Sequence, residues 1–179
     1  DQLAAGKMTD AQLKSAAAGF YKVANLELAE IIYNLYIERS LKTLPPEKII
    51  QELFEIASFF VYKPQGLYDM VYAEEIYAKI ESLGGKDVFN QATIYLRTFN
   101  LEKLRDYSGS GKLYLQLIRL YPQTKYFNEA VYKIAMINAY ALANLNEAKK
   151  YFNLLAAKTE FSPHRLASLY QLGLLAQWE

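Results

Sequence analysis

Residues 126–158 have the sequence YFNEAVYKIAMINAYALANLNEAKKYFNLLAAK, and this stretch decides the fold. Apolar residues recur in it at helical spacing, which predicts one helix over 126–143 and a second over 147–158. A connection as short as Asn144-Leu145-Asn146 makes the two helices an antiparallel hairpin. The second helix contains a small residue, Ala148, followed four positions later by an aromatic residue, Phe152.

The same small–aromatic pair occurs three more times in the chain. The earlier pairs are Ala29 with Tyr33, Ala73 with Tyr77, and Ser110 with Tyr114. Successive small residues lie 44, 37 and 38 positions apart, and a period of about 20–50 residues indicates stacked supersecondary units. Strand signals are nearly absent. The sequence therefore predicts an all-α fold, an α-solenoid of about nine helices arranged as antiparallel hairpins.

Proline, glycine and capping residues predict where the hairpins begin and end. We expect a single repeat domain over 1–179 with hairpins at 9–42, 46–84, 87–122 and 126–159, and an unpaired helix at 163–178. Asp87 is expected to cap the first helix of the third hairpin. The chain starts at Asp1 without a methionine, which predicts a fragment of a longer protein. The last helix would leave Leu172, Leu175 and Trp178 uncovered and open to self-association.

Composition excludes several classes of protein. Hydrophobic residues make up 53% of the chain, which excludes disorder, and the net charge of +1 comes without the dense basic face that nucleic-acid binding needs. No cysteine is present, so disulfides and thiolate metal sites are excluded, and no apolar run is long enough to span a membrane. The sixteen tyrosines are unusual, and tyrosine is enriched where proteins contact partners.

The repeats resemble those of the tetratricopeptide repeat family, in which small residues allow helices to pack closely and large ones fill the gaps. Leu13, Ala16, Ala17 and Phe20 match first-helix positions of that family, and Ala148 and Phe152 match second-helix positions. The segment Ile118-Arg119-Leu120-Tyr121-Pro122-Gln123-Thr124 is similar to repeats of bacterial outer-membrane assembly lipoproteins and of Tol–Pal coordinators. That similarity implies a place in the bacterial periplasm or cell envelope, with the cytoplasm as the alternative.

The resemblance implies that the α-solenoid is right-handed. It also implies a function. Such proteins are protein–protein interaction scaffolds that hold a partner segment in a concave groove formed by the first helix of each hairpin. Aromatic residues interspersed with lysines suit an extended or helical peptide with some acidic character. The positions that the family register turns toward the groove are Lys14, Tyr21, Lys22, Tyr95, Phe99, Lys133, Ile137, Tyr140 and Tyr170.

The sequence predicts no enzyme, no cofactor and no metal site. His164, the only histidine, follows a proline at a helix start and lacks the partners of a triad or a metal cluster. The segment Asp106–Lys112 departs from a phosphate-binding loop at Asp106 and Leu113, so we interpret it as a hairpin turn. The leading hypothesis is a non-catalytic scaffold. A self-associating structural subunit is the alternative, and a helical-solenoid enzyme ranks last.

Overall fold

Capped turns divide the chain into helices. The computed structural model describes residues 7–177, and this range contains nine α-helices and no strand, which confirms the all-α prediction. The α-helices are α2 (Asp10–Lys22), α3 (Leu26–Thr43), α4 (Pro46–Phe60), α5 (Met70–Gly84), α6 (Gln91–Lys103), α7 (Tyr107–Leu120), α8 (Phe127–Met136), α9 (Leu145–Ala156) and α10 (Pro163–Ala176). Two further turns are the 3₁₀-helix η1 (Lys86–Val88) and the π-helical turn η2 (Ile137–Ala141).

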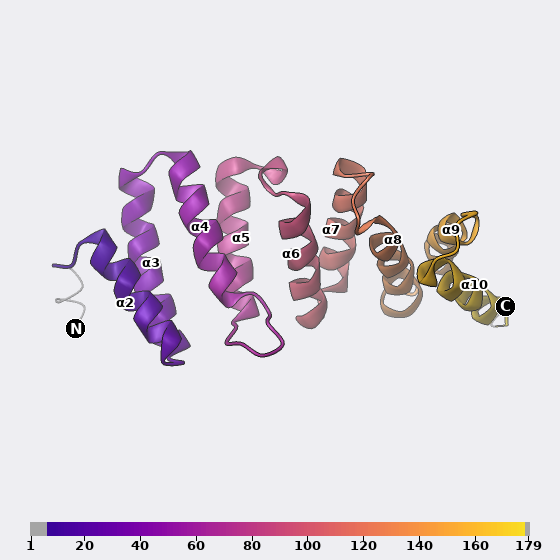
Figure 1. Ribbon diagram of the computed structural model, residues 1–179, viewed down its shortest axis with the longest axis horizontal. Helices are drawn as coiled ribbons and strands as arrows, with labels where there is room; N and C mark the ends of the chain where they lie inside the picture. Colours follow the sequence, from indigo (N-terminus) through magenta and orange to yellow (C-terminus); the bar gives the residue numbers. More distant parts are fainter. Residues whose placement is uncertain (1–6, 178–179) are drawn as a thin grey trace. The chain divides into compact units, whose positions relative to one another are not determined.

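Neighbouring helices pack in pairs within two compact units, of which the first ends at Val88 and the second begins at Phe89. In the first unit α2 packs on α3 and α4 packs on α5 (Figure 1). In the second unit α6 packs on α7, α8 on α9, and α9 also on α10. Each unit is described below by itself, and the single repeat domain over 1–179 stays a prediction.

The four small–aromatic pairs form the contact surfaces of the second helix in each hairpin. Ala29, Ala73, Ser110 and Ala148 are all completely buried. Their aromatic partners Tyr33, Tyr77, Tyr114 and Phe152 are at most 3% exposed. A small side chain lets two helix backbones approach, and the aromatic ring one turn later fills the space beside them. The repeated small–aromatic pairs therefore serve helix packing.

Each of these helices also begins with a side-chain cap. Asparagine or aspartate accepts a hydrogen bond from a backbone N–H of the first turn, which satisfies an otherwise unpaired donor. The four caps are Asn25, Asp69, Asp106 and Asn144. Every one of them lies four residues before a small residue, and its carbonyl accepts the N–H of that residue at 2.9–3.1 Å. The structural repeat is thus cap, small residue and aromatic, spaced by four.

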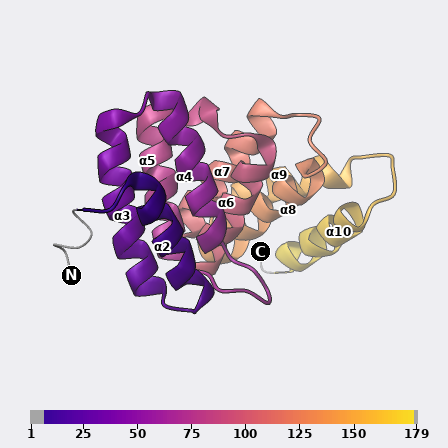
Figure 2. The ribbon, with the colours of Figure 1, turned by 60° about the vertical axis from the view of Figure 1, so that its left-hand side comes forward.

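Three of the hairpin turns share one backbone conformation. Ala24, Arg105 and Ala143, which directly precede the caps, have φ angles of 62°, 62° and 53°. The fourth turn is different, because residues 61–69 form a longer connection between α4 and α5 (Figures 1 and 2). The N–H of Asp69 nevertheless donates to the carbonyl of Phe60 at 3.0 Å, so the ends of this longer loop meet as the ends of the short turns do.

One expectation about a helix start is wrong. Asp87 does not cap α6, since it lies in η1, and the cap is Asn90, whose side chain accepts from the N–H of Thr93 at 2.9 Å. The start is delayed because Phe89 is buried and its carbonyl accepts from the hydroxyl of Tyr121 at 3.0 Å. The chain can enter the helix only after that anchored residue.

The last helix is not uncovered on the predicted side. Leu175 is completely buried in the core cluster of Ala135, Ala139, Ala148 and Phe152, and Leu172 packs against the same cluster. Trp178 lies outside the described residues. The large hydrophobic side chains of α10 that face solvent are Leu166, Leu169 and Tyr170, which are 58%, 44% and 65% exposed.

Candidate functional site

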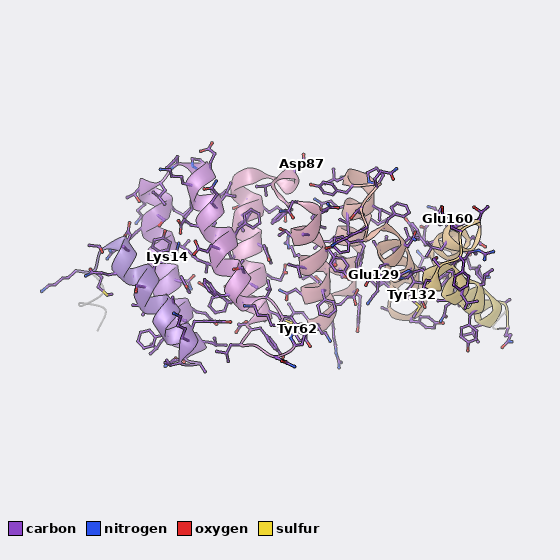
Figure 3. The ribbon with its side chains drawn as sticks, in the orientation of Figure 1. Lys14, Tyr62, Asp87, Glu129, Tyr132 and Glu160 are labelled. Carbon is purple, nitrogen blue, oxygen red and sulfur yellow. The ribbon has the colours of Figure 1, made fainter. Side chains whose placement is uncertain are left out.

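Lys14 is held by α4 through two ion pairs. Its Nζ lies 2.6 Å from Oε2 of Glu52 and 2.7 Å from Oε2 of Glu55. Lys14 is labelled in Figure 3. Partial burial lowers the pKa of Lys14, but the hydrogen bonds and charges of the two carboxylates outweigh it and raise the pKa overall. Lys14 therefore joins α2 to α4 and presents little unneutralised charge to a partner.

Tyr21 also connects elements of the first unit. Its hydroxyl lies 2.9 Å from the carbonyl oxygen of Phe59 and 2.8 Å from that of Leu67, and it donates its one proton between them. Its ring packs against Phe59 and Phe60, with centroids 5.4 and 5.5 Å away. Tyr21 thus fixes the α4–α5 connection to α2, whereas Lys22 is exposed at the end of that helix.

In the second unit, Tyr95 likewise makes a hydrogen bond and a ring contact within the chain. Its hydroxyl donates to Oε1 of Glu129 at 2.8 Å, and its ring stacks on Tyr126 with centroids 4.1 Å apart; Glu129 is labelled in Figure 3. Burial, followed by the hydrogen bond to Glu129, raises the pKa of Tyr95. Phe99 is half-buried beneath the ammonium of Lys103, which lies 5.3 Å from the ring centroid.

Three predicted groove residues meet at one cavity. Lys133, Ile137 and Tyr140 line a space of about 310 Å³ in the second unit, at the lower end of the range for binding pockets of about 300–1,000 Å³. The remaining lining residues are Glu102, Tyr107, Met136 and Ala141. Ile137 is 6% exposed and belongs to the interior, while Tyr107 and Tyr140 are 38% and 47% exposed. The cavity is therefore apolar within, with two exposed tyrosines in its lining.

A π-helical turn shapes this cavity. The N–H of Leu142 donates to the carbonyl of Ile137 at 3.0 Å, five residues back, in place of the usual four. Ile137, Tyr140 and Ala141 all belong to this turn, η2. The predicted α-helix over 126–143 thus ends at Met136. Single π-turns occur frequently at functional sites, and here the turn carries three of the seven lining residues.

Glu102 connects the cavity to the core. Its Oε1 accepts from the hydroxyl of Tyr114 at 2.7 Å, and its Oε2 accepts from Nζ of Lys133 at 2.7 Å. Tyr114 is only 1% exposed. Burial is the main cause that raises the pKa of its hydroxyl, and the charge of Glu102 adds to it. The ammonium of Lys133 is therefore positioned by a carboxylate that the buried tyrosine holds in place.

Sequence reasoning missed four of the lining residues. Glu102 lies seven residues after Tyr95 and three after Phe99, so the helical face already chosen could have been extended to it. Met136 likewise shares the face of Lys133 and Tyr140. Tyr107 comes from the start of α7, which the register of the first helices does not reach. The structure leaves Tyr170 apart, on the exposed side of α10.

The other motifs are explained by structure. Asp106 caps α7 by accepting from the N–H of Gly109 at 2.8 Å, so Asp106–Lys112 is a hairpin turn followed by a helix start. The ring centroid of His164 lies 5.8 Å from that of Tyr132, whose ring also contacts Phe152. Tyr132 is labelled in Figure 3. Within residues 7–177 no three acidic or histidine side chains are grouped as metal ligands. No helix in that range has the length and apolar character to cross a membrane.

A cluster of acidic residues around Glu30 in the first unit makes the stability of the folded chain depend on pH. The pKa of Glu30 is raised to about 7, mainly by burial. The charge and hydrogen bond of Asp69 and the charges of Glu75 and Glu27 add to this effect. Glu30 therefore binds its proton more tightly in the folded chain than in the unfolded one. Its contribution to stability is complete below about pH 4.5 and is lost as the pH rises through about 7.

We expect the free energy of unfolding to fall by about 1 kcal/mol between pH 5 and pH 8 from this group, a value reduced for solvent screening. Glu30→Gln stays neutral and should abolish that part of the decline, as measured by urea unfolding at both pH values. Glu38→Gln, an exposed site on the same helix, is the matched control. An equal decline in both variants would contradict the assignment to Glu30.

Comparison of the chain with protein-family models, with curated proteins and with solved structures finds no match.

Proposed function

We propose that this chain is a non-catalytic scaffold that binds a segment of a partner protein in the cavity of its second unit. One observation supports this above the others: Lys133, Ile137 and Tyr140, chosen by repeat register alone, line the same cavity. The π-turn and the exposed tyrosines at that cavity support it as well. The tetratricopeptide-like repeats, and the bacterial cell envelope as the compartment, belong to the same proposal.

The rest of the predicted groove has a different role in this proposal. Lys14, Tyr21 and Tyr95 form ion pairs or hydrogen bonds within the chain, and these contacts keep the helices in place. A partner would gain little by displacing them, because each displaced hydrogen bond must be replaced. Lys133 and Tyr140 also have hydrogen-bond partners within the chain, Glu102 and Gln171, but they differ from the other three in lining one cavity with Ile137. The proposed binding surface is therefore at α8 and η2.

Site-specific photocrosslinking tests the proposal. A benzophenone amino acid in place of Tyr140, in cells that make the protein, should give a crosslinked product of one defined mass. Adding Ile137→Asp should reduce its yield at least tenfold, because a charge inside the apolar cavity opposes burial of a partner side chain. The product is quantified by gel shift and mass spectrometry.

The matched control places the same amino acid at Leu154, which is 48% exposed on α9 and does not line the cavity. The same product from both positions, or none from Tyr140, would refute binding at the cavity.

Self-association is the second candidate, because α10 exposes Leu166, Leu169 and Tyr170. Apolar faces of this kind are buried when copies of a chain associate. Concentration-dependent sedimentation that Leu166→Ser together with Leu169→Ser abolishes would favour this candidate. A monomer at all concentrations would count against it.

A further inference from the structure

Lys133 is the cationic hydrogen-bond donor in the lining of the cavity, and its charge is paired with that of Glu102. Both carboxylate oxygens of Glu102 already accept a hydrogen bond, one from Tyr114 and one from Lys133. The ammonium of Lys133 has three protons, and the pair with Glu102 uses one of them. Its side chain is 33% exposed, so the remaining protons are accessible to an incoming acceptor.

The rest of the cavity suits one apolar side chain. Met136, Ile137 and Ala141 form its apolar lining, in which Ile137 is buried, Met136 half-buried and Ala141 exposed. A methionine adapts its shape to the group that it contacts. Tyr107 and Tyr140 supply aromatic faces at its edge. A ligand must therefore combine an apolar side chain with a neighbouring hydrogen-bond acceptor.

Charge decides which acceptor is favoured. From Phe89 onward the chain has eleven lysines and arginines but six aspartates and glutamates. Up to Val88 the balance is reversed, with nine basic residues and thirteen acidic ones. The small net charge of the whole chain thus conceals an acidic first unit and a basic second one. The field of a basic unit attracts acidic partners and raises their association rate.

We propose that the cavity binds an acidic peptide segment, which places one leucine- or phenylalanine-type side chain in the apolar interior and a neighbouring carboxylate against Lys133. This inference rests on the proposed function and specifies the class of partner. A basic segment would oppose Lys133 and the surrounding field. A neutral apolar segment would offer Lys133 only neutral carbonyl acceptors and would gain no attraction from the field of the basic unit.

The test uses the whole chain and three fluorescein-labelled decapeptides. The first has a central phenylalanine flanked on both sides by glutamate and aspartate. The second replaces every acidic residue by lysine, and the third replaces the phenylalanine by serine. Fluorescence anisotropy at low and at physiological salt measures affinity, and ¹⁵N chemical-shift changes locate the site. We expect the first peptide to bind at least about tenfold more tightly than the others and to lose affinity with salt.

Two matched variants test whether Lys133 contacts the carboxylate of the acidic peptide. Lys133→Met should weaken binding of the acidic peptide by about five- to tenfold, whereas Lys112→Met, an exposed site on α7 outside the cavity, should change it less than twofold. Shift changes of the first peptide should include the amides of η2. The peptide comparison is made on the unaltered chain. It therefore tests the preference for an acidic segment even where Lys133→Met lowers stability.

Each result separates the inference from the proposed function. Equal affinity for the acidic and the lysine peptides, with shifts at η2, would overturn the acidic preference and leave the scaffold proposal standing. Absence of binding by the acidic peptide would also overturn the inference, and photocrosslinking at Tyr140 would then decide the scaffold proposal independently. Shifts at η2 that appear on concentrating the chain alone would assign the cavity to a second copy and overturn the peptide partner.

Discussion

Replacing Phe152 by alanine should lower the free energy of unfolding by about 3–5 kcal/mol, the largest effect that we expect from a single substitution. Phe152 is completely buried and contacts the ring of Tyr132, with centroids 5.8 Å apart. It lies in one cluster with Ala148 and Leu175, so its removal leaves a cavity where α8, α9 and α10 meet. Urea unfolding followed by circular dichroism measures the loss.

The control for this prediction is Leu154→Ala on the same helix. Leu154 is 48% exposed, so its truncation should cost less than about 1 kcal/mol. Similar losses at Phe152 and Leu154 would show that α9 does not pack through the face described. That result would also remove the basis for treating the small–aromatic pairs as contact surfaces.

Replacing Glu102 by alanine should lower the free energy of unfolding by about 2–3 kcal/mol, although Glu102 is polar and partly exposed. The substitution leaves the hydroxyl of Tyr114, at 1% exposure, without its carboxylate acceptor. It also leaves Lys133 without its ion-pair partner. Glu102→Gln keeps an acceptor oxygen and should cost about 1 kcal/mol.

A double-mutant cycle tests this assignment. Tyr114→Phe removes the hydroxyl, so the double variant Glu102→Ala, Tyr114→Phe should be about 1 kcal/mol more stable than the sum of the single effects predicts. Strict additivity would mean that the hydrogen bond between the two side chains contributes nothing to stability. The same denaturation experiment supplies all four free energies.

The packing of the helices could be predicted from particular residues. Ala148 and Phe152 identify the buried face of α9 because small and aromatic residues one turn apart have few uses other than close helix contact. The caps at the same helix starts were available as well, since asparagine or aspartate precedes each small residue by four positions. Asp87 led to the wrong start for α6, because an acidic residue before a helix does not reveal that Phe89 must first be anchored.

The candidate site was less accessible to sequence reasoning. The register selected Lys133, Ile137 and Tyr140, which line one cavity, and their role in binding a partner stays a prediction. It also placed Lys14 and Tyr21 in the groove, because a helical face does not indicate whether a neighbouring helix supplies Glu52 or a carbonyl to satisfy them. The π-turn could not be predicted, since its single extra residue per turn depends on tertiary packing and has no compositional signal.

The cap that begins every second helix has a practical consequence for engineering this chain. Each hairpin restores its own register at the cap, so residues added before the cap do not displace the buried pair that follows it. The α4–α5 connection already carries such extra residues, and Pro64, Gln65 and Gly66 within it are exposed. A fluorophore or affinity tag inserted there would leave Tyr21, Asp69 and Ala73 in their present contacts. The loop is thus a permissive insertion point in the first unit, outside the candidate site in the second.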